Sequence, residues 1–283
     1  FELARVSALP VQVVARNSPG AGITSMQIIT ALQREILVPH HKQQTEGYKT
    51  AYDLIGIDKG GLIGQPLIGL FSDVAEIDFV SMYPSVIRRY NISPETVGNQ
   101  HLDAGFVQEL ERFVDREQPG LVPETLAPLL DKRIALKQRL LELDSRDCRY
   151  KPYKARSAAL KWLLVVCFGY TGYKNARFGK IEAHEAITAY AREALLRAKE
   201  AAEALGFTVL HMYVDGLWIQ KPGACSVADF QPLLDEIVER TGLPIALDGI
   251  YKWIAFLPSR QDARTPVPNR YLGVFKNGEV KVR

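Results

Sequence analysis

The sequence predicts an α+β fold in which an antiparallel sheet with packed helices is interrupted by an inserted helical hairpin. Two turn signals indicate the sheet, because apolar runs flank both Asp215-Gly216 and Asn277-Gly278. Dipeptides of this kind between apolar runs favour tight turns between antiparallel strands. Two long amphipathic patterns within residues 120–170, joined by a short polar link, indicate the hairpin of helices.

Composition places few limits on function. A chain of 283 residues is long enough for one large domain or two smaller ones. The net charge of +3 permits nucleic-acid binding without indicating it. The 3 cysteines form no C-x-x-C motif, so we expect no zinc site or disulfide framework, and a reducing, intracellular setting fits best. No apolar run approaches the roughly 20 residues that a membrane span needs.

The stretch around Asp78 is the centre of the prediction. Residues 74–80 have the pattern of a buried strand, and Pro84 predicts that the chain turns sharply at Tyr83-Pro84. An acidic side chain at a strand end, followed by free backbone N–H groups, suits a metal ion that carries a phosphate. From this stretch alone, an ordinary surface strand followed by a plain turn is an equal alternative.

The remaining elements follow from periodicity and from turn residues. Early in the chain we expect a helix from Ser25 to about Arg34, a turn at Gly60-Gly61 and a helix over residues 104–115. Further helices are predicted over 124–143, 153–168, 183–205 and 227–241. Strands are predicted over 207–213, 217–219, 245–256, 271–275 and 280–282.

Cations are spaced at helical intervals on the predicted hairpin. Arg133 and Lys137 are four residues apart, and Lys154 and Lys161 are seven apart, so each pair shares a helix face. A row of cations at one place can bind a triphosphate. Two solvated helix faces with routine lysines and arginines are the alternative, and these charges alone favour it.

The order of these motifs resembles that of family B DNA polymerases. Residues 78–85, Asp-Phe-Val-Ser-Met-Tyr-Pro-Ser, resemble the first palm motif of that family, Asp-x-x-Ser-Leu-Tyr-Pro-Ser. Lys161 with Phe168-Gly169 resembles the fingers motif, and residues 177–178 and 185–188 resemble the segment after it. Gly60-Gly61 resembles the template-contacting loop, and Arg270-Tyr271 resembles the element that contacts the primer.

The resemblance implies a role for each matching residue. Asp78 would bind two magnesium ions, or manganese, with help from the Phe79 carbonyl. The backbone N–H groups of Ser81 and Met82 would hold the triphosphate, and Tyr83 would exclude a 2′-hydroxyl. The remaining nucleotide-binding candidates are Arg133, Lys137 and Lys161, and the DNA-binding candidates are Gly60, Gly61, Arg270 and Tyr271.

The third palm motif departs from the family pattern Tyr-Gly-Asp-Thr-Asp-Ser. Matching Tyr213 to the tyrosine of the motif would leave Leu217 in place of the indispensable second Asp. Matching residues 217–219 to the apolar residues after the motif makes Asp215 that second Asp, with Tyr213 replacing the dispensable first one. We favour this second register, in which Asp215 lies at a turn and is the second catalytic metal ligand. At the fingers motif, Val165-Val166 replace Asn-Ser and Phe168 replaces Tyr.

These inferences predict a right-hand polymerase palm with inserted fingers. We expect an N-terminal connector and first part of the palm over 1–119, fingers over 120–170 and the second part of the palm over 171–283. The predicted activity is DNA-directed DNA synthesis by two-metal-ion phosphoryl transfer, with low processivity and no proofreading by this chain. Its partners would be primer-template DNA, deoxynucleoside triphosphates and an accessory protein, in the cytoplasm with the nucleoid.

Two other functions remain open on the sequence. The altered third motif favours an inactive polymerase relative that acts as a DNA-binding or scaffold subunit. The apolar pair Val165-Val166 favours a lesion-bypass polymerase or a template-independent transferase.

Overall fold

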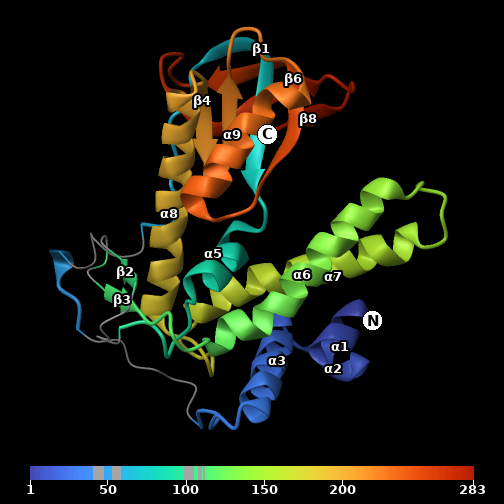
Figure 1. Cartoon of the computed structure of the whole chain (residues 1–283), viewed down its shortest axis with the longest axis vertical. Coiled ribbons are helices and arrows are strands. Elements are labelled where there is room, and N and C mark those ends of the chain that lie inside the picture. Colours follow the sequence, from blue (N-terminus) through green and yellow to red (C-terminus); the bar gives the residue numbers. More distant parts are fainter. Residues whose placement is uncertain (41–47, 53–58, 99–104, 108–109, 111) are drawn as a thin grey trace. The chain divides into compact units, whose positions relative to one another are not determined.

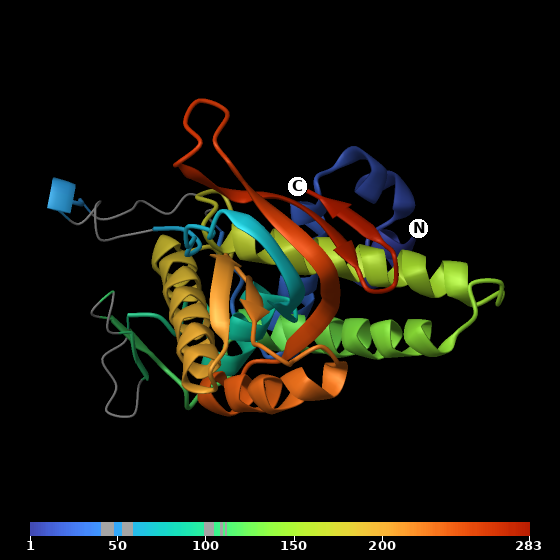
Figure 2. The ribbon, with the colours of Figure 1, turned by 90° about the horizontal axis from the view of Figure 1, so that it is seen from above.

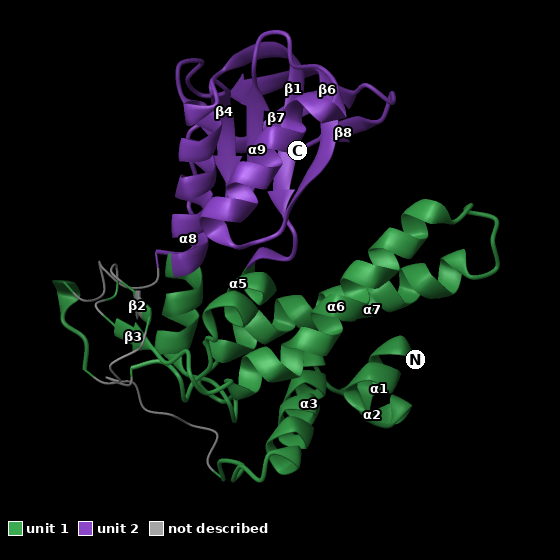
Figure 3. Cartoon of the chain, viewed as in Figure 1, with its two compact units in different colours: residues 1–58, 83–189 green, residues 59–82, 190–283 purple. Residues whose placement is uncertain are grey.

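The computed structural model (Figure 1) describes residues 1–40, 48–52, 59–98, 105–107, 110 and 112–283. The chain divides into two compact units (Figure 3). Unit 1 comprises residues 1–58 and 83–189, and unit 2 comprises residues 59–82 and 190–283. No helix in the described ranges is long and apolar enough to cross a membrane.

Unit 2 is built on a six-stranded antiparallel sheet with the order β4-β5-β1-β6-β7-β8. Its strands are curved, as the view from above shows (Figure 2). The strands are β1 (Gly69–Phe79), β4 (Thr208–Tyr213), β5 (Gly216–Gln220), β6 (Ile245–Pro258), β7 (Pro266–Phe275) and β8 (Val280–Val282). Helix α9 (Val227–Thr241) packs against β6. Each predicted strand is present, and both predicted hairpins are confirmed.

Helix α9 begins and ends where its sequence predicts. Ser226 and Asp229 form a reciprocal capping box at its start. At its end Gly242 adopts φ 67°, a left-handed conformation that glycine accepts without steric cost.

Unit 1 consists mainly of helices. Its N-terminal helices are α1 (Glu2–Ser7), α2 (Val11–Arg16) and α3 (Pro19–Gln33), and α3 packs against both α6 (Leu121–Glu142) and α7 (Tyr150–Thr171). The predicted pair of long helices is therefore confirmed, each with a slightly longer span. Helix α8 (Ile181–Ala204) begins in unit 1, and its residues from Tyr190 onward belong to unit 2.

Three sequence predictions in unit 1 are wrong. Helix α3 begins at Pro19 with Ser18 as its N-cap, not at Ser25, because proline fits the first position of a helix. The sharp turn predicted at Tyr83-Pro84 is instead the first turn of α5 (Met82–Tyr90), where the missing N–H of Pro84 has no helical partner to lose. In place of a helix over 104–115, β2 (Gly105–Val107) pairs with β3 (Arg112–Val114), a segment too short for periodicity to separate strand from helix.

A buried histidine connects β4, at one edge of the curved sheet, to β7 near the other edge. His211 of β4 is 1% exposed and stacks on Trp218, with ring centroids 4.9 Å apart. Its Nε2 accepts a hydrogen bond from the Asn269 N–H at 3.1 Å, so Nδ1 carries the proton and donates to the Gly64 carbonyl at 3.0 Å. Burial lowers the pKa of His211 to about 4, although the bond to Gly64 acts in the opposite direction.

This lowered pKa predicts acid sensitivity. The unfolded chain, with an ordinary histidine pKa near 6.5, takes up a proton before the folded chain does, so stability falls as the pH drops from about 6.5 to about 4. The free energy of unfolding should fall by about 3 kcal/mol, because each pH unit between the two pKa values contributes about 1.36 kcal/mol. Urea unfolding across this range should show a shallower pH dependence for His211→Gln than for the wild type, and equal slopes would contradict the assignment.

Candidate active site

The carboxylate of Asp78 lies at the end of β1, between two neighbouring strands. Asp78 pairs with Gly216 of β5 on one side and with Ala246 of β6 on the other. Asp215 directly precedes Gly216, so the two predicted metal ligands meet at one end of the sheet. A Cβ on Gly216 would lie 3.5 Å from Asp78 Oδ1, so the glycine leaves open space beside this carboxylate.

Asp78 has an unfavourable environment for its charged form. Burial is the largest cause that raises its pKa, followed by the charges of Asp215, Asp248 and Glu76, and together they bring it to about 8. Lys281 opposes this shift. Among the described residues, nothing donates a hydrogen bond to the Asp78 carboxylate or forms an ion pair with it. A bound cation would relieve this electrostatic cost.

Asp215 lies in a strained turn. The two-residue turn consists of Val214 and Asp215, one residue earlier than the Asp-Gly turn that the sequence predicts, and Gly216 begins β5. Val214 has φ 56°, and the Asp215 N–H donates to the Tyr213 carbonyl at 2.7 Å, which closes a γ-turn. A positive φ is costly for a β-branched residue.

Backbone bonds hold this turn in place. The Phe79 N–H donates to the Asp215 carbonyl at 2.9 Å, which ties the turn to the end of β1. The Val214 N–H donates to the Leu62 carbonyl at 2.8 Å. Leu217 pairs with Ile77, and both are fully buried, so Leu217 is not the neighbour of Asp78. Asp215 thus lies at the same end of the sheet as Asp78, and its role as the second metal ligand stays a prediction.

Glu76 belongs to a buried network that the sequence prediction missed. Glu76 is 6% exposed and accepts bonds from Tyr251 Oη at 2.6 Å and from Lys281 Nζ at 2.7 and 2.8 Å. It lies two residues before Asp78, on the same side of β1. The alternation of side chains along the predicted strand could have placed Glu76 on the same side as Asp78. Its partners Tyr251 and Lys281 could not be predicted, because they lie on strands that are distant in the sequence.

The predicted oxygen ligands suit a hard cation. Two carboxylates and the Phe79 carbonyl are the donor types that magnesium and manganese prefer. The described part of the chain contains no group of three or more histidine, cysteine, aspartate or glutamate residues that could hold a metal. Any metal here would therefore depend on Asp78, Asp215 and backbone oxygen, and on ligands from solvent or substrate.

Ser81 and Met82 lie where β1 passes into α5. Ser81 has φ 51°, and α5 begins at Met82. The first N–H groups of a helix lack partners within the helix and attract anions. These two residues are therefore placed in a suitable local conformation for the predicted contact with phosphate.

The predicted nucleotide-binding cations in unit 1 differ in exposure. Lys137 on α6 and Lys161 on α7 are exposed. Arg133, one helical turn before Lys137, is only 7% exposed, and burial lowers its pKa. Arg133 and Lys137 are four residues apart on α6 but are not equally exposed to solvent, because α6 packs against both α7 and α3.

Tyr83 begins a stack of three rings within unit 1. Its ring lies against that of Phe168, with centroids 4.0 Å apart and 9° between the planes. The other face of Phe168 stacks on His184, at 4.4 Å and 21°. The sequence indicated Tyr83 and Phe168, whereas no sequence signal singled out His184.

The predicted DNA contacts lie in unit 2. Gly60 has φ 64°, and its carbonyl accepts a bond from Arg192 at 2.5 Å. A Cβ on Gly61 would lie 3.0 Å from the side chain of Val214, so this glycine permits a close approach to the turn. Arg270 donates to the Pro258 carbonyl at 2.8 Å. Tyr271 is 1% exposed and lies in an aromatic cluster with Trp218, so its ring is part of the core.

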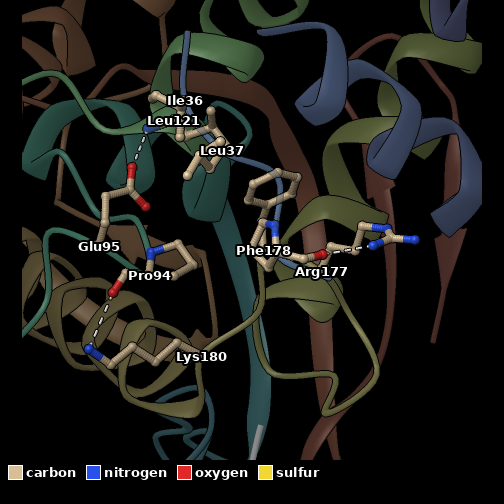
Figure 4. A pocket seen from close by; sticks show the side chains of 9 residues that line it. Ile36, Leu37, Pro94, Glu95, Leu121, Arg177, Phe178 and Lys180 are labelled. Carbon is tan, nitrogen blue, oxygen red and sulfur yellow. Dashed lines mark hydrogen bonds between the residues drawn. The ribbon is translucent and has the colours of Figure 1, made fainter. Parts of the chain in front are cut away.

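A separate apolar pocket of about 410 Å³ lies in unit 1 (Figure 4). Its polar groups are engaged with the protein itself. Glu95 accepts a bond from the Leu121 N–H at 2.6 Å, and Lys180 donates to the Pro94 and Val97 carbonyls at 3.2 and 2.6 Å. These bonds hold the start of α6 and the loop at 93–97 in place. We therefore interpret the pocket as part of the packing of unit 1 and not as a binding site.

An antiparallel sheet with two carboxylates at adjacent strand ends, in a chain with a long helical pair, defines a right-hand polymerase palm with fingers. Comparison with known proteins agrees with this class. The profile of DNA polymerase family B matches residues 9–215. The chain therefore belongs to DNA polymerase family B.

Several relatives match almost the whole chain. DNA polymerase 2 of Saccharolobus solfataricus is 34% identical over 99% of this chain and 40% of its own length. A DNA polymerase of Archaeoglobus fulgidus is 29% identical over 100% of this chain and 34% of its own length. The structure of the family B DNA polymerase from Pyrobaculum calidifontis covers 99% of this chain and 35% of that chain, with a TM-score of 0.70 and 29% identity. The chain spans about a third to two fifths of these relatives.

The Glu76 network yields a stability prediction. Lys281→Met should destabilise the chain by about 3 kcal/mol, because it leaves the buried Glu76 carboxylate without its cation. Lys276→Met is the matched control, since Lys276 pairs with Asp73 where both side chains are about 40% exposed, and it should destabilise the chain much less than Lys281→Met does. Urea unfolding of both variants measures the difference, and equal losses would show that Glu76 does not depend on Lys281.

Proposed function

We propose that this chain carries the polymerising site of a family B DNA polymerase, which adds deoxynucleotides to a primer 3′ end on a DNA template. The proposal depends on one observation. Asp215 lies beside Asp78 at one end of the sheet, whereas Leu217 is buried and pairs with Ile77. Two carboxylates at adjacent strand ends are the ligand set that a pair of divalent ions needs for phosphoryl transfer.

Asp78, Asp215 and the Phe79 carbonyl would hold two magnesium ions, with manganese as a substitute. Bound there, the ions would activate the primer hydroxyl and neutralise charge on the transferred phosphoryl group. The raised pKa of Asp78 supports this assignment, because a carboxylate that is costly to ionise alone is stabilised in its charged form by a cation.

The other contacts come from backbone N–H groups and cations. The N–H groups of Ser81 and Met82 would hold the triphosphate at the start of α5. Lys137 and Lys161 would neutralise it, and their exposure supports that role. Arg133 is proposed with them on the motif alone, since its side chain is buried.

Tyr83 would pack against the sugar and exclude a 2′-hydroxyl. Gly60 and Gly61 would contact the template strand, and Arg270 the primer. Tyr271 is proposed with Arg270 on the motif alone, since its side chain is buried. The helical pair α6–α7 would form the fingers. Low processivity, the absence of proofreading and an accessory protein stay predictions from the sequence.

A catalytically inactive relative that binds DNA or serves as a scaffold is the second candidate. Tyr213 stands where the family has its first Asp of the third motif, and it packs against the aromatic cluster of the sheet. This replacement favours loss of activity.

Primer extension by the 283-residue chain with magnesium separates the two candidates. Asp78→Asn and Asp215→Asn should each lower the rate by about 1,000-fold or more, because each removes a charged ligand worth several kcal/mol in the transition state. Asp235→Asn is the matched control, because this exposed carboxylate on α9 accepts a bond only from Gln231 among the described residues, and it should extend primers at the wild-type rate.

Three outcomes would count against the proposal. Retention of DNA binding without extension by the wild type under any condition supports the inactive relative. An unchanged rate for Asp215→Asn refutes the register that makes it the second ligand. An equal loss in Asp235→Asn would show that the effect is one of general stability.

A further inference from the structure

The three-ring stack in unit 1 contains one residue, His184, that belongs to none of the motifs described above. His184 lies in the first turns of α8, and its imidazole faces the ring of Phe168 on the side opposite Tyr83. All three residues belong to unit 1, so the stack is an internal feature of one compact body. The centroid distances of 4.0 and 4.4 Å are those of rings in direct contact.

The end of α7 fixes the imidazole. His184 Nδ1 lies 3.3 Å from the Phe168 carbonyl oxygen and 3.5 Å from Thr171 Oγ1. The Thr171 hydroxyl donates to the same carbonyl at 2.6 Å. A Cβ on Gly172 would lie 2.9 Å from His184 Cγ, so only glycine leaves room for the ring here. His184 is therefore held by the segment that carries Phe168.

Phe168 depends on this packing more than a tyrosine would. The family motif has a tyrosine at this position, whose hydroxyl can form a directional bond, whereas a phenylalanine ring is positioned by contacts alone. Its two faces are covered by Tyr83 and His184. Removal of either neighbour would leave one face of Phe168 without its partner.

We propose that His184 is a positioning residue for sugar selection, which holds Phe168 against Tyr83 and so fixes the ring that excludes the 2′-hydroxyl. This inference rests on the proposed polymerase function and on the role of Tyr83 within it. A histidine that only fills space would contribute to stability without affecting the choice between ribonucleotides and deoxynucleotides. The two roles therefore differ in a measurable ratio.

The test compares incorporation of deoxynucleotides and ribonucleotides by the full chain. His184→Ala should lower the discrimination ratio by about 10-fold, which corresponds to about 1.4 kcal/mol and to the size of one aromatic stacking contact. The change should appear mainly as a lower KM for the ribonucleotide, because a displaced Tyr83 admits the extra hydroxyl. His184→Phe keeps a flat ring beside Phe168 and should restore most of the discrimination.

Two further variants calibrate the result. Tyr83→Ala should lose discrimination at least as strongly as His184→Ala. His211→Ala removes a histidine from another aromatic stack, in unit 2, and should reduce stability while leaving the ratio unchanged. Thermal unfolding of each variant shows whether a change in discrimination between ribonucleotides and deoxynucleotides is due to loss of the fold.

The outcomes distinguish this inference from the proposed function. If the wild type extends no primer, the polymerase proposal fails, and fluorescence titration with a deoxynucleoside and a ribonucleoside triphosphate still decides the role of His184. An unchanged preference in His184→Ala, by extension or by binding, overturns the inference. An unchanged preference in Tyr83→Ala also overturns it, because His184 is proposed to act only through that ring.

Discussion

The main electrostatic constraint at this end of the sheet in unit 2 is the free-energy cost of ionising Asp78. Burial and the charges of three carboxylates raise its pKa to about 8, and the cation that opposes this shift, Lys281, donates to both oxygens of Glu76. The sheet therefore neutralises Glu76 internally and leaves Asp78 without a side-chain countercharge among the described residues. A site arranged in this way favours a cation from solution. Metal binding would displace the proton that Asp78 otherwise holds near neutral pH, which couples metal affinity to pH.

The strained turn at Val214 links this carboxylate end to the glycine loop. A positive φ at a β-branched residue costs about 1–3 kcal/mol, and surrounding bonds must hold it. The Leu62 carbonyl accepts from Val214, Gly61 lies against the Val214 side chain, and the Gly64 carbonyl accepts from His211. The segment proposed to touch the template is thus bonded to the strand and turn that present Asp215.

The sequence predicted the long helices, both hairpins and the meeting of Asp78 with Asp215, because periodicity and turn dipeptides are local signals. It could not predict contacts between distant segments. The backbone N–H groups at the start of α6 donate to the side chains of Asn91, Ser93 and Glu95, about 30 residues upstream, where the sequence indicates only a turn. Arg133 has the spacing of an exposed cation but is buried, because neighbouring helices cover α6. The start of α5 at Met82-Tyr83-Pro84 was missed because proline is compatible with both a turn and the first turn of a helix.

The departures from the family pattern differ in how the structure accommodates them. Phe168 in place of tyrosine loses a hydroxyl, yet its ring is held on both faces by Tyr83 and His184. In the favoured register, Tyr213 replaces the first Asp of the third motif. Its ring packs against the aromatic cluster of the sheet, so the lost carboxylate is replaced by core packing and not by another metal ligand. At Phe168, packing on both faces of the ring can therefore substitute for the hydrogen bond that a tyrosine hydroxyl would form. Under the proposed function, Asp78 and Asp215 would be the carboxylates left to bind the metal ions, because packing cannot substitute for a carboxylate.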